Sequence, residues 1–169
     1  MTNIREETPA DFQAVRRVNE LAFGRPEEAA LVEALRTSAE GYVSLVAEVG
    51  GQVVGHIFFS PVTVGEEGPP FAALGLAPMA VLPEWQRRGV GSLLVREGLK
   101  ECLRAGYKVV VVLGHPEFYP RFGFVKAASR GLSCEYDAPE EAFMVAELEP
   151  GALGGRRGVV RYRPEFGSV

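Results

Sequence analysis

Residues 79–94 read M-A-V-L-P-E-W-Q-R-R-G-V-G-S-L-L and place a glycine-rich turn between an apolar strand and an apolar helix. Gly89 and Gly91 lack the side chains that would keep an anion away from the backbone. A helix N-terminus also offers free N–H groups and a positive dipole end, and Arg87 and Arg88 can add charge-assisted hydrogen bonds. The stretch therefore predicts a phosphate site, although a glycine turn that only begins a helix has the same pattern.

The elements on either side of this turn predict a parallel strand pair joined by a helix. A long apolar strand that contains Pro78 is expected over residues 71–82, and a proline cannot donate a hydrogen bond to a neighbouring strand. Pro78 therefore indicates a bulge, a sheet edge or the place where pairing stops. A helix is expected over residues 89–105, and residues 107–113 follow as a fully buried strand of the kind that a parallel sheet requires. The crossover between the two strands should be right-handed.

The rest of the chain predicts a mostly antiparallel sheet flanked by helices. Apolar residues recur at helical spacing in the first part of the chain, and the period changes to that of strands from Tyr42 onward. The expected elements are a strand at 3–7, helices beginning at Pro9 and Pro26, a β-hairpin of strands 43–49 and 52–64, a loop at 66–70, a short helical turn at 115–122, and strands near 143–148 and 158–162. The expected fold class is α/β (α+β), a mixed sheet with one central crossover.

Length and composition favour a single cytoplasmic domain over residues 1–169. A chain of this length buries roughly 70% of its surface on folding, and 47% of its residues are hydrophobic. The N-terminus has no apolar signal region, and no apolar run reaches the roughly 18 residues of a membrane span, so no membrane contact is expected. The net charge of −4 argues against nucleic-acid binding. Cys102 and Cys134 match no metal-ligand spacing, and no metal site is expected.

Two common phosphate-binding motifs do not fit the glycine turn. A Walker loop requires a Gly-Lys pair, which the sequence does not contain. A dinucleotide fingerprint requires a third glycine where Leu94 stands, and no acidic residue ends the strand at 107–113 to hold a ribose. A protein that binds ATP or NAD is therefore disfavoured.

A second motif, F-Y-P-R-F-G-F at residues 118–124, follows the buried strand that the sequence predicts. Together with P-E-W-Q-R-R-G-V-G at residues 83–91, it resembles the two signatures of the GNAT superfamily of N-acetyltransferases. The segments G-H-P-E (114–117) and M-V-A-E-L-E-P-G-A-L (144–153) are similar to the bacterial YhbS-like branch of that family. The resemblance covers nearly the whole chain and implies a GNAT-like sheet with a splayed central pair of parallel strands.

The resemblance also implies acetyl-CoA as the acetyl donor. Its pyrophosphate is expected at the turn, on Arg87, Arg88, Gly89, Val90, Gly91 and Ser92. Its pantetheine arm is expected on the strand backbone of Met79, Ala80 and Val81. The acetyl group should lie near Met79, where a strand amide can polarise the carbonyl. Tyr119 matches the family tyrosine and is the expected general acid for the leaving thiolate, although its ring could also pack beside the cofactor without moving a proton.

The sequence does not identify the general base. The candidates are Glu84, Glu117, His56 and His115, and each also has a structural interpretation. A lysine-like amine has a pKa near 10.4 and must lose a proton before it can attack. Bulk water that reaches the amine can suffice for this step.

The expected acceptor is a primary amine on a small molecule or a protein. A basic run of Arg156, Arg157, Arg161 and Arg163 is interpreted as a solvated strand face, with an anionic acceptor or a homodimer contact as alternatives. A non-catalytic sensor of acyl-CoA is the alternative to the enzyme. Tyr119 favours the enzyme, whereas the missing base favours the sensor.

Overall fold

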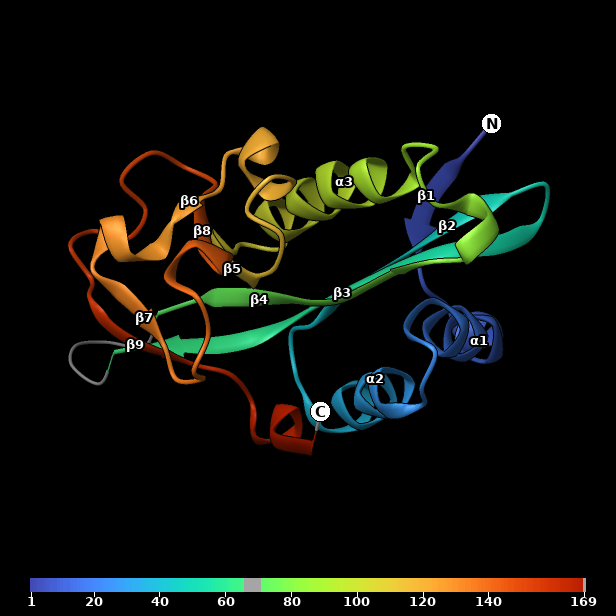
Figure 1. Ribbon diagram of the computed structural model, residues 1–169, viewed down its shortest axis with the longest axis horizontal. Coiled ribbons are helices and arrows are strands. Elements are labelled where there is room, and N and C mark those ends of the chain that lie inside the picture. The colour runs from blue at the N-terminus through green and yellow to red at the C-terminus, as the bar shows by residue number, and fades with distance from the viewer. Residues whose placement is uncertain (66–70, 169) are drawn as a thin grey trace.

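The computed structural model describes residues 1–65 and 71–168, and these residues form a nine-stranded mixed sheet with helices on both faces (Figure 1). The strand order is β1-β2-β3-β4-β5-β8-β6, while β9 pairs with the end of β3 and β7 pairs with β9. The strands are β1 (Asn3–Glu6), β2 (Val43–Val49), β3 (Gln52–Val64), β4 (Ala73–Val81), β5 (Val109–Leu113), β6 (Val125–Lys126), β7 (Leu132–Cys134), β8 (Phe143–Glu147) and β9 (Gly158–Arg161). The helices are α1 (Phe12–Phe23), α2 (Glu27–Ser38) and α3 (Val90–Arg104), and the 3₁₀ helices are η1 (Pro9–Asp11), η2 (Pro83–Trp85), η3 (Tyr119–Phe122), η4 (Ala127–Arg130), η5 (Glu140–Ala142) and η6 (Pro164–Ser168).

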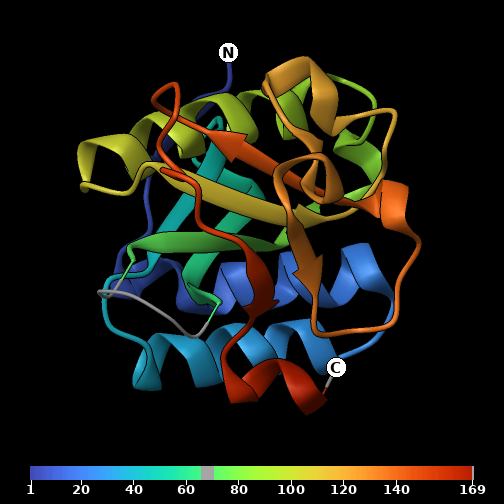
Figure 2. The same ribbon diagram turned by 90° about the vertical axis from the view of Figure 1, so that its left-hand side faces the viewer.

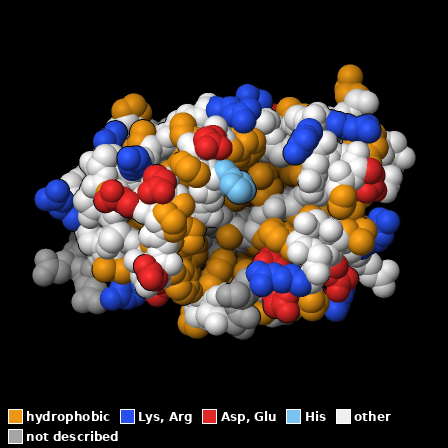
Figure 3. Space-filling view, viewed as in Figure 1, with side chains coloured by type: hydrophobic (Ala, Val, Ile, Leu, Met, Phe, Trp, Pro, Cys, Tyr) orange, Lys and Arg blue, Asp and Glu red, His pale blue; other side chains and the backbone are white. Residues whose placement is uncertain are grey.

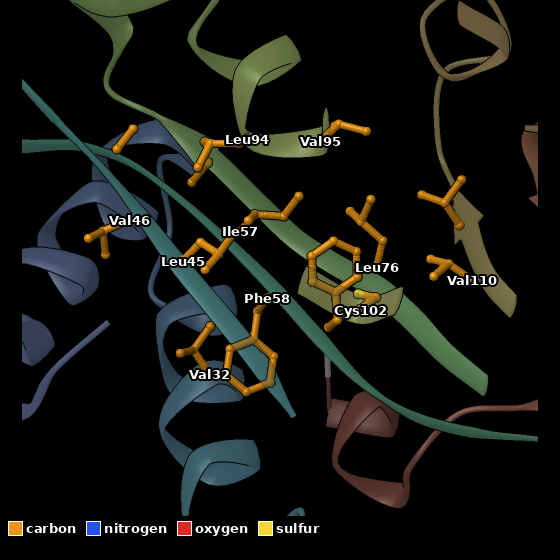
Figure 4. Close-up of a cluster of buried hydrophobic side chains, with 14 of the residues drawn as sticks. Val32, Leu45, Val46, Ile57, Phe58, Leu76, Leu94, Val95, Cys102 and Val110 are labelled. Atoms are coloured by element: carbon orange, nitrogen blue, oxygen red, sulfur yellow. The ribbon is translucent and has the colours of Figure 1, made fainter. Parts of the chain in front are cut away.

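The sheet separates two layers of helices. In Figure 2, α3 covers one face of the sheet, and α1 and α2 cover the opposite face with η6 beside α2. Phe58 of β3 packs toward Val32 of α2, whereas the preceding Ile57 lies on the side of Leu94 of α3 (Figure 4). Successive residues of β3 thus fill the two cores in turn, as the two-residue period of a strand requires. No helix within the described residues has the length and apolar character needed to cross a bilayer.

The central strand β4 changes its pairing at Pro78. β4 pairs in parallel with β5 only over Ala73–Leu76, while its antiparallel pairing with β3 continues to Val81. The register shifts between these two stretches, so that Ala77 and Pro78 stand opposite a single residue of β3. This confirms the bulge and the end of pairing that Pro78 indicates, and it confirms the splayed parallel pair. The backbone of Met79–Val81 consequently has a strand partner on one side only.

The structure differs from the elements predicted from sequence in three places. The helical turn expected at 115–122 is a 3₁₀ helix over Tyr119–Phe122 alone. The strand expected at 107–113 begins at Val109, and its last residue, Leu113, is 40% exposed rather than buried because β4 has already diverged from β5 there. Strands β6 and β7 were not predicted, because two or three residues are too few to show a period. The loop predicted at residues 66–70 lies outside the described residues.

His56 of β3 is buried on the α1 side of the sheet and has a structural role. Its Nδ1 lies 3.2 Å from Nδ2 of Asn19, and its Nε2 lies 2.9 Å from Oγ of Ser44. An amide nitrogen can only donate, so Nδ1 accepts this hydrogen bond and Nε2 carries the ring proton toward Ser44. The side chain has no solvent exposure, which removes His56 from the candidates for the general base.

Burial of His56 should make the fold sensitive to acid. Burial, with a smaller repulsion from Arg36, lowers the pKa of His56 to about 3, whereas an unfolded histidine titrates near 6.5. Between these values the unfolded chain binds the extra proton, so the free energy of unfolding falls as the pH drops from about 6.5 toward 3. The contribution of this residue has a slope of up to about 1.4 kcal/mol per pH unit. Urea unfolding at several pH values between 7 and 4 measures it.

The variant His56→Gln isolates this contribution, because an amide can occupy the same polar site without titrating. We expect it to lose less stability than the wild type over the same pH range, whatever its stability at pH 7. His115→Gln is the matched control, because it makes the same exchange at an exposed histidine away from the buried site. An unaltered slope in His56→Gln would contradict the prediction.

Candidate active site

A cavity of about 720 Å³ opens where β4 diverges from β5. It is lined by Met79, Val81, Trp85, Gln86, Arg87, Gly89, Gly91, Ser92, His115, Glu117, Phe118, Tyr119 and Arg121. Of the two histidines only His115 reaches the surface, and Figure 3 shows it in pale blue at the edge of a hollow with hydrophobic side chains below. Three segments that are distant in sequence therefore meet here: the end of β4, the turn before α3, and the segment that carries η3.

The end of β4 forms the first wall and presents unpaired backbone. Met79 and Val81 line the cavity, and β3 occupies only their other side. The carbonyl of Val81 accepts a hydrogen bond from Nε2 of Gln86 at 3.0 Å, which ties the turn to the strand. An extended ligand with amide groups can pair with such an edge in the way that a peptide strand does.

The turn before α3 forms the second wall. Gly89 is the N-cap of α3 with φ 84°, and Arg87 has φ 63°. The left-handed region costs a non-glycine residue about 1–2 kcal/mol, and such residues concentrate at functional sites. A Cβ on Gly91 would lie 3.6 Å from Cε of Met79 and 3.9 Å from Cζ of Phe118, both of which line the cavity. Backbone alone therefore forms the cavity surface at Gly91, beside the free N–H groups of the first helical turn.

Tyr119 stands in the third wall, and its ring is held on several sides. A Cβ on Gly114 would lie 2.5 Å from Cε2 of this ring, so only glycine allows the observed contact. The rings of Phe118 and Phe124 meet it edge-on, with centroids 5.0 and 5.6 Å away. The residue is 6% exposed, and burial raises the pKa of Tyr119 to about 12. The hydroxyl therefore stays protonated throughout the physiological pH range.

The cavity brings together most, but not all, of the residues that the sequence singles out. Met79, Val81, Arg87, Gly89, Gly91, Ser92 and Tyr119 line it. The side chains of Ala80 and Val90 are instead part of the hydrophobic core, because strand alternation and the inner face of α3 direct them there. Arg88 does not line the cavity either; its guanidinium lies 5.0 Å from the ring centroid of Trp85. Ala80, Val90 and Arg88 can therefore contribute to this cavity only through their backbone.

Several residues that line the cavity were not assigned to the cofactor site from the sequence. Trp85 was not among the expected cofactor-binding residues, but it lines the cavity as well as contacting Arg88. Arg121 has a local signal, since it lies two residues after Tyr119 within the second motif. Among the base candidates, Glu117 and His115 are exposed and line the cavity, whereas Glu84 does not line it.

The chemistry of the cavity suits a long anionic ligand with amide groups. Unpaired strand backbone lies at one end, and a helix N-terminus with Arg87 at the other. Gly91 leaves the space that a phosphate close to the backbone would need. No group of three or more histidine, cysteine or carboxylate side chains in the described residues is arranged to hold a metal ion.

Comparison with known proteins gives a consistent result. Residues 3–127 match the family model described as acetyltransferase (GNAT) domain. The chain is 39% identical over 164 residues to the uncharacterized N-acetyltransferase YhbS of Escherichia coli K12, covering 96% of this chain and 97% of that protein. It is 42% identical over 136 residues to the uncharacterized N-acetyltransferase YjhQ of the same organism, covering 78% and 75% of the two chains.

Solved structures extend the similarity to the whole fold. The structure of Escherichia coli YhbS in complex with CoA has a TM-score of 0.91 and 38% identity, covering 98% of this chain and 92% of that one. A GNAT family acetyltransferase from Brucella melitensis in complex with acetyl-CoA has a TM-score of 0.80 and 36% identity, covering 98% of both chains. Both of these relatives bind the class of ligand that the cavity suits.

Proposed function

The chain belongs to the GNAT family of acetyltransferases, and from this premise we propose that residues 1–169 are one catalytic domain that transfers the acetyl group of acetyl-CoA to a primary amine. The acceptor amine belongs to a small molecule or a protein. Acetyl-CoA is a metabolite of the cytoplasm, and we place the activity there.

The observation that carries this proposal is the divergence of β4 from β5. It leaves the backbone of Met79–Val81 without a neighbouring strand on the side where the cavity opens. In our proposal this edge pairs with the amides of the pantetheine arm, and the first turn of α3 with Arg87 binds the pyrophosphate. The ligands of the two relatives at 38% and 36% identity support this assignment. Bound acetyl-CoA would supply a reactive thioester, and the residues of this chain would position it.

Tyr119 is the proposed general acid. Its pKa of about 12 keeps the proton on the phenol oxygen until the leaving sulfur develops negative charge. A strand amide near Met79 is the proposed donor to the carbonyl oxygen of the acetyl group. For the acceptor amine we assign no single base, since His115 and Glu117 are both exposed at the cavity and water reaches the same rim.

The release of free thiol from acetyl-CoA in the presence of an amine tests the proposed function. We expect the protein with acetyl-CoA to release free thiol when at least one of a polyamine, an amino-acid amide and a lysine-containing peptide is present. A tertiary amine of matched charge, which cannot be acetylated to a stable amide, should give no release above background. Tight binding of CoA by calorimetry, without turnover for any primary amine, would support the sensor instead. The absence of CoA binding would overturn both readings.

A further inference from the structure

We propose that Arg121 binds the 3′-phosphate of CoA and allows the protein to distinguish CoA from its 3′-dephospho form. The inference rests on the proposed function, because it requires CoA in the cavity. It goes further by assigning the part of the ligand that neither the strand edge nor the helix N-terminus accounts for.

Arg121 is held at the cavity by an aromatic contact. Its guanidinium carbon lies 5.0 Å from the ring centroid of Phe118. The far edge of that same ring, Cζ, lies 3.9 Å from the position that a Cβ on Gly91 would take. Phe118 therefore lies beside both Arg121 and the first turn of α3, and it holds a cation at the same cavity as the proposed pyrophosphate site. Such stacking restricts the long side chain before any ligand arrives.

The charge of the ligand requires a second cationic position. CoA carries a pyrophosphate and a separate 3′-phosphate, and a phosphate monoester has about −1.5 to −2 charges at pH 7. The first turn of α3 and Arg87 can serve the pyrophosphate, which leaves the 3′-phosphate without a partner. At the cavity rim, where Glu117 adds a negative charge, a doubly charged phosphate is held more favourably beside a cation.

Among the arginines near the cavity, Arg121 meets this requirement best. Arg88 faces Trp85, and Arg96 lies 5.2 Å from the ring centroid of Phe122; neither lines the cavity. Arg87 and Arg121 line it on different walls. In the described part of the chain Arg121 has no carboxylate partner, so its guanidinium fork remains available for a phosphate.

Calorimetric titration with CoA and with 3′-dephospho-CoA tests the assignment without requiring an acceptor. We expect the wild type to bind CoA about 10-fold more tightly than 3′-dephospho-CoA, as one exposed charge-assisted contact allows. Arg121→Gln should weaken CoA binding about 10-fold and leave binding of 3′-dephospho-CoA unchanged, so the preference disappears. Arg87→Gln should weaken both ligands by the same factor and keep the preference. Arg96→Gln, which removes a similarly stacked arginine outside the cavity, should change neither.

The outcomes separate this inference from the proposed function. A wild type that binds both ligands equally, or an Arg121→Gln variant that loses both equally, would overturn the role of Arg121 while CoA binding itself stands. The role of Arg121 would also be overturned if Arg87→Gln, rather than Arg121→Gln, abolished the preference for CoA over 3′-dephospho-CoA. Failure of the wild type to bind either ligand would instead overturn the proposed function.

Discussion

Replacing Tyr119 with phenylalanine is expected to lower kcat about 100-fold or more and to change the KM for acetyl-CoA by less than about threefold. The substitution removes one hydroxyl and keeps the ring that Gly114, Phe118 and Phe124 hold in place. The cavity therefore keeps its shape, and binding of the donor should persist. What is lost is the proton that Tyr119 is proposed to offer the departing sulfur as its bond to the acetyl carbon breaks. Thiol release at saturating amine measures the effect.

The raised pKa of Tyr119 predicts that the proposed proton donor does not limit the rate at neutral or moderately alkaline pH. An acid acts only while it is protonated, and a pKa of about 12 keeps Tyr119 protonated well above neutral pH. The rate should consequently rise with pH as the acceptor amine loses its proton, with no fall below about pH 11 from loss of this acid. Phenols of this pKa are weaker acids than a thiol of about 8.5, so the hydroxyl stabilises the sulfur chiefly while the bond is breaking.

Tyr42→Phe is the matched control for this prediction. Tyr42 stacks on Phe58 with centroids 5.0 Å apart and does not line the cavity, so its hydroxyl should not affect turnover. Turnover of Tyr119→Phe within twofold of the wild type would contradict the acid role and leave Tyr119 as a packing residue. A large rise in KM with unchanged kcat would assign its hydroxyl to donor binding instead.

The parts of the site that depend on backbone chemistry could be predicted from sequence. Pro78 has no N–H to donate, and the structure shows the bulge and the end of parallel pairing that follow from this. Gly89 adopts a left-handed conformation at the start of α3, as a glycine in a strand-to-helix turn suggests. Such features depend only on the residue and its close neighbours in the chain, so a single sequence is enough to predict them.

The parts that depend on convergence of distant side chains could not be predicted. Arg121 and Trp85 each lie within a motif, but they reach the same cavity from segments that are remote in the chain, and no local period encodes that convergence. Ala80 and Val90 lie within the predicted motif, yet their side chains enter the core because alternation and helix rotation are fixed by packing. The sequence likewise names no acceptor.

Replacing Gly91 with aspartate is expected to weaken CoA binding at least 100-fold, or about 2.7 kcal/mol, while making the protein more stable. The new side chain fits, because a Cβ at Gly91 makes only ordinary contacts with Met79 and Phe118. It would nevertheless occupy the space beside the first turn of α3 and place a negative charge where the pyrophosphate is proposed to lie. A carboxylate in a first helical turn favours folding by about 0.3–1 kcal/mol, and the loss of a helical glycine favours it further because the unfolded chain becomes less flexible. Calorimetry with CoA and urea unfolding measure the two effects.

A gain in stability together with a loss of CoA affinity separates a binding role for Gly91 from a structural one, because a damaged fold cannot become more stable. Leu93→Asp adds the same charge two residues later, at a side chain that is 37% exposed and outside the cavity lining, and should change the affinity for CoA less than threefold. Gly91→Ala adds bulk without charge and should fall between the two. If Gly91→Asp bound CoA with an affinity within fivefold of the wild type, the assignment of the pyrophosphate to this turn would be wrong. The cation of Arg87 would then have to hold it without the helix N-terminus.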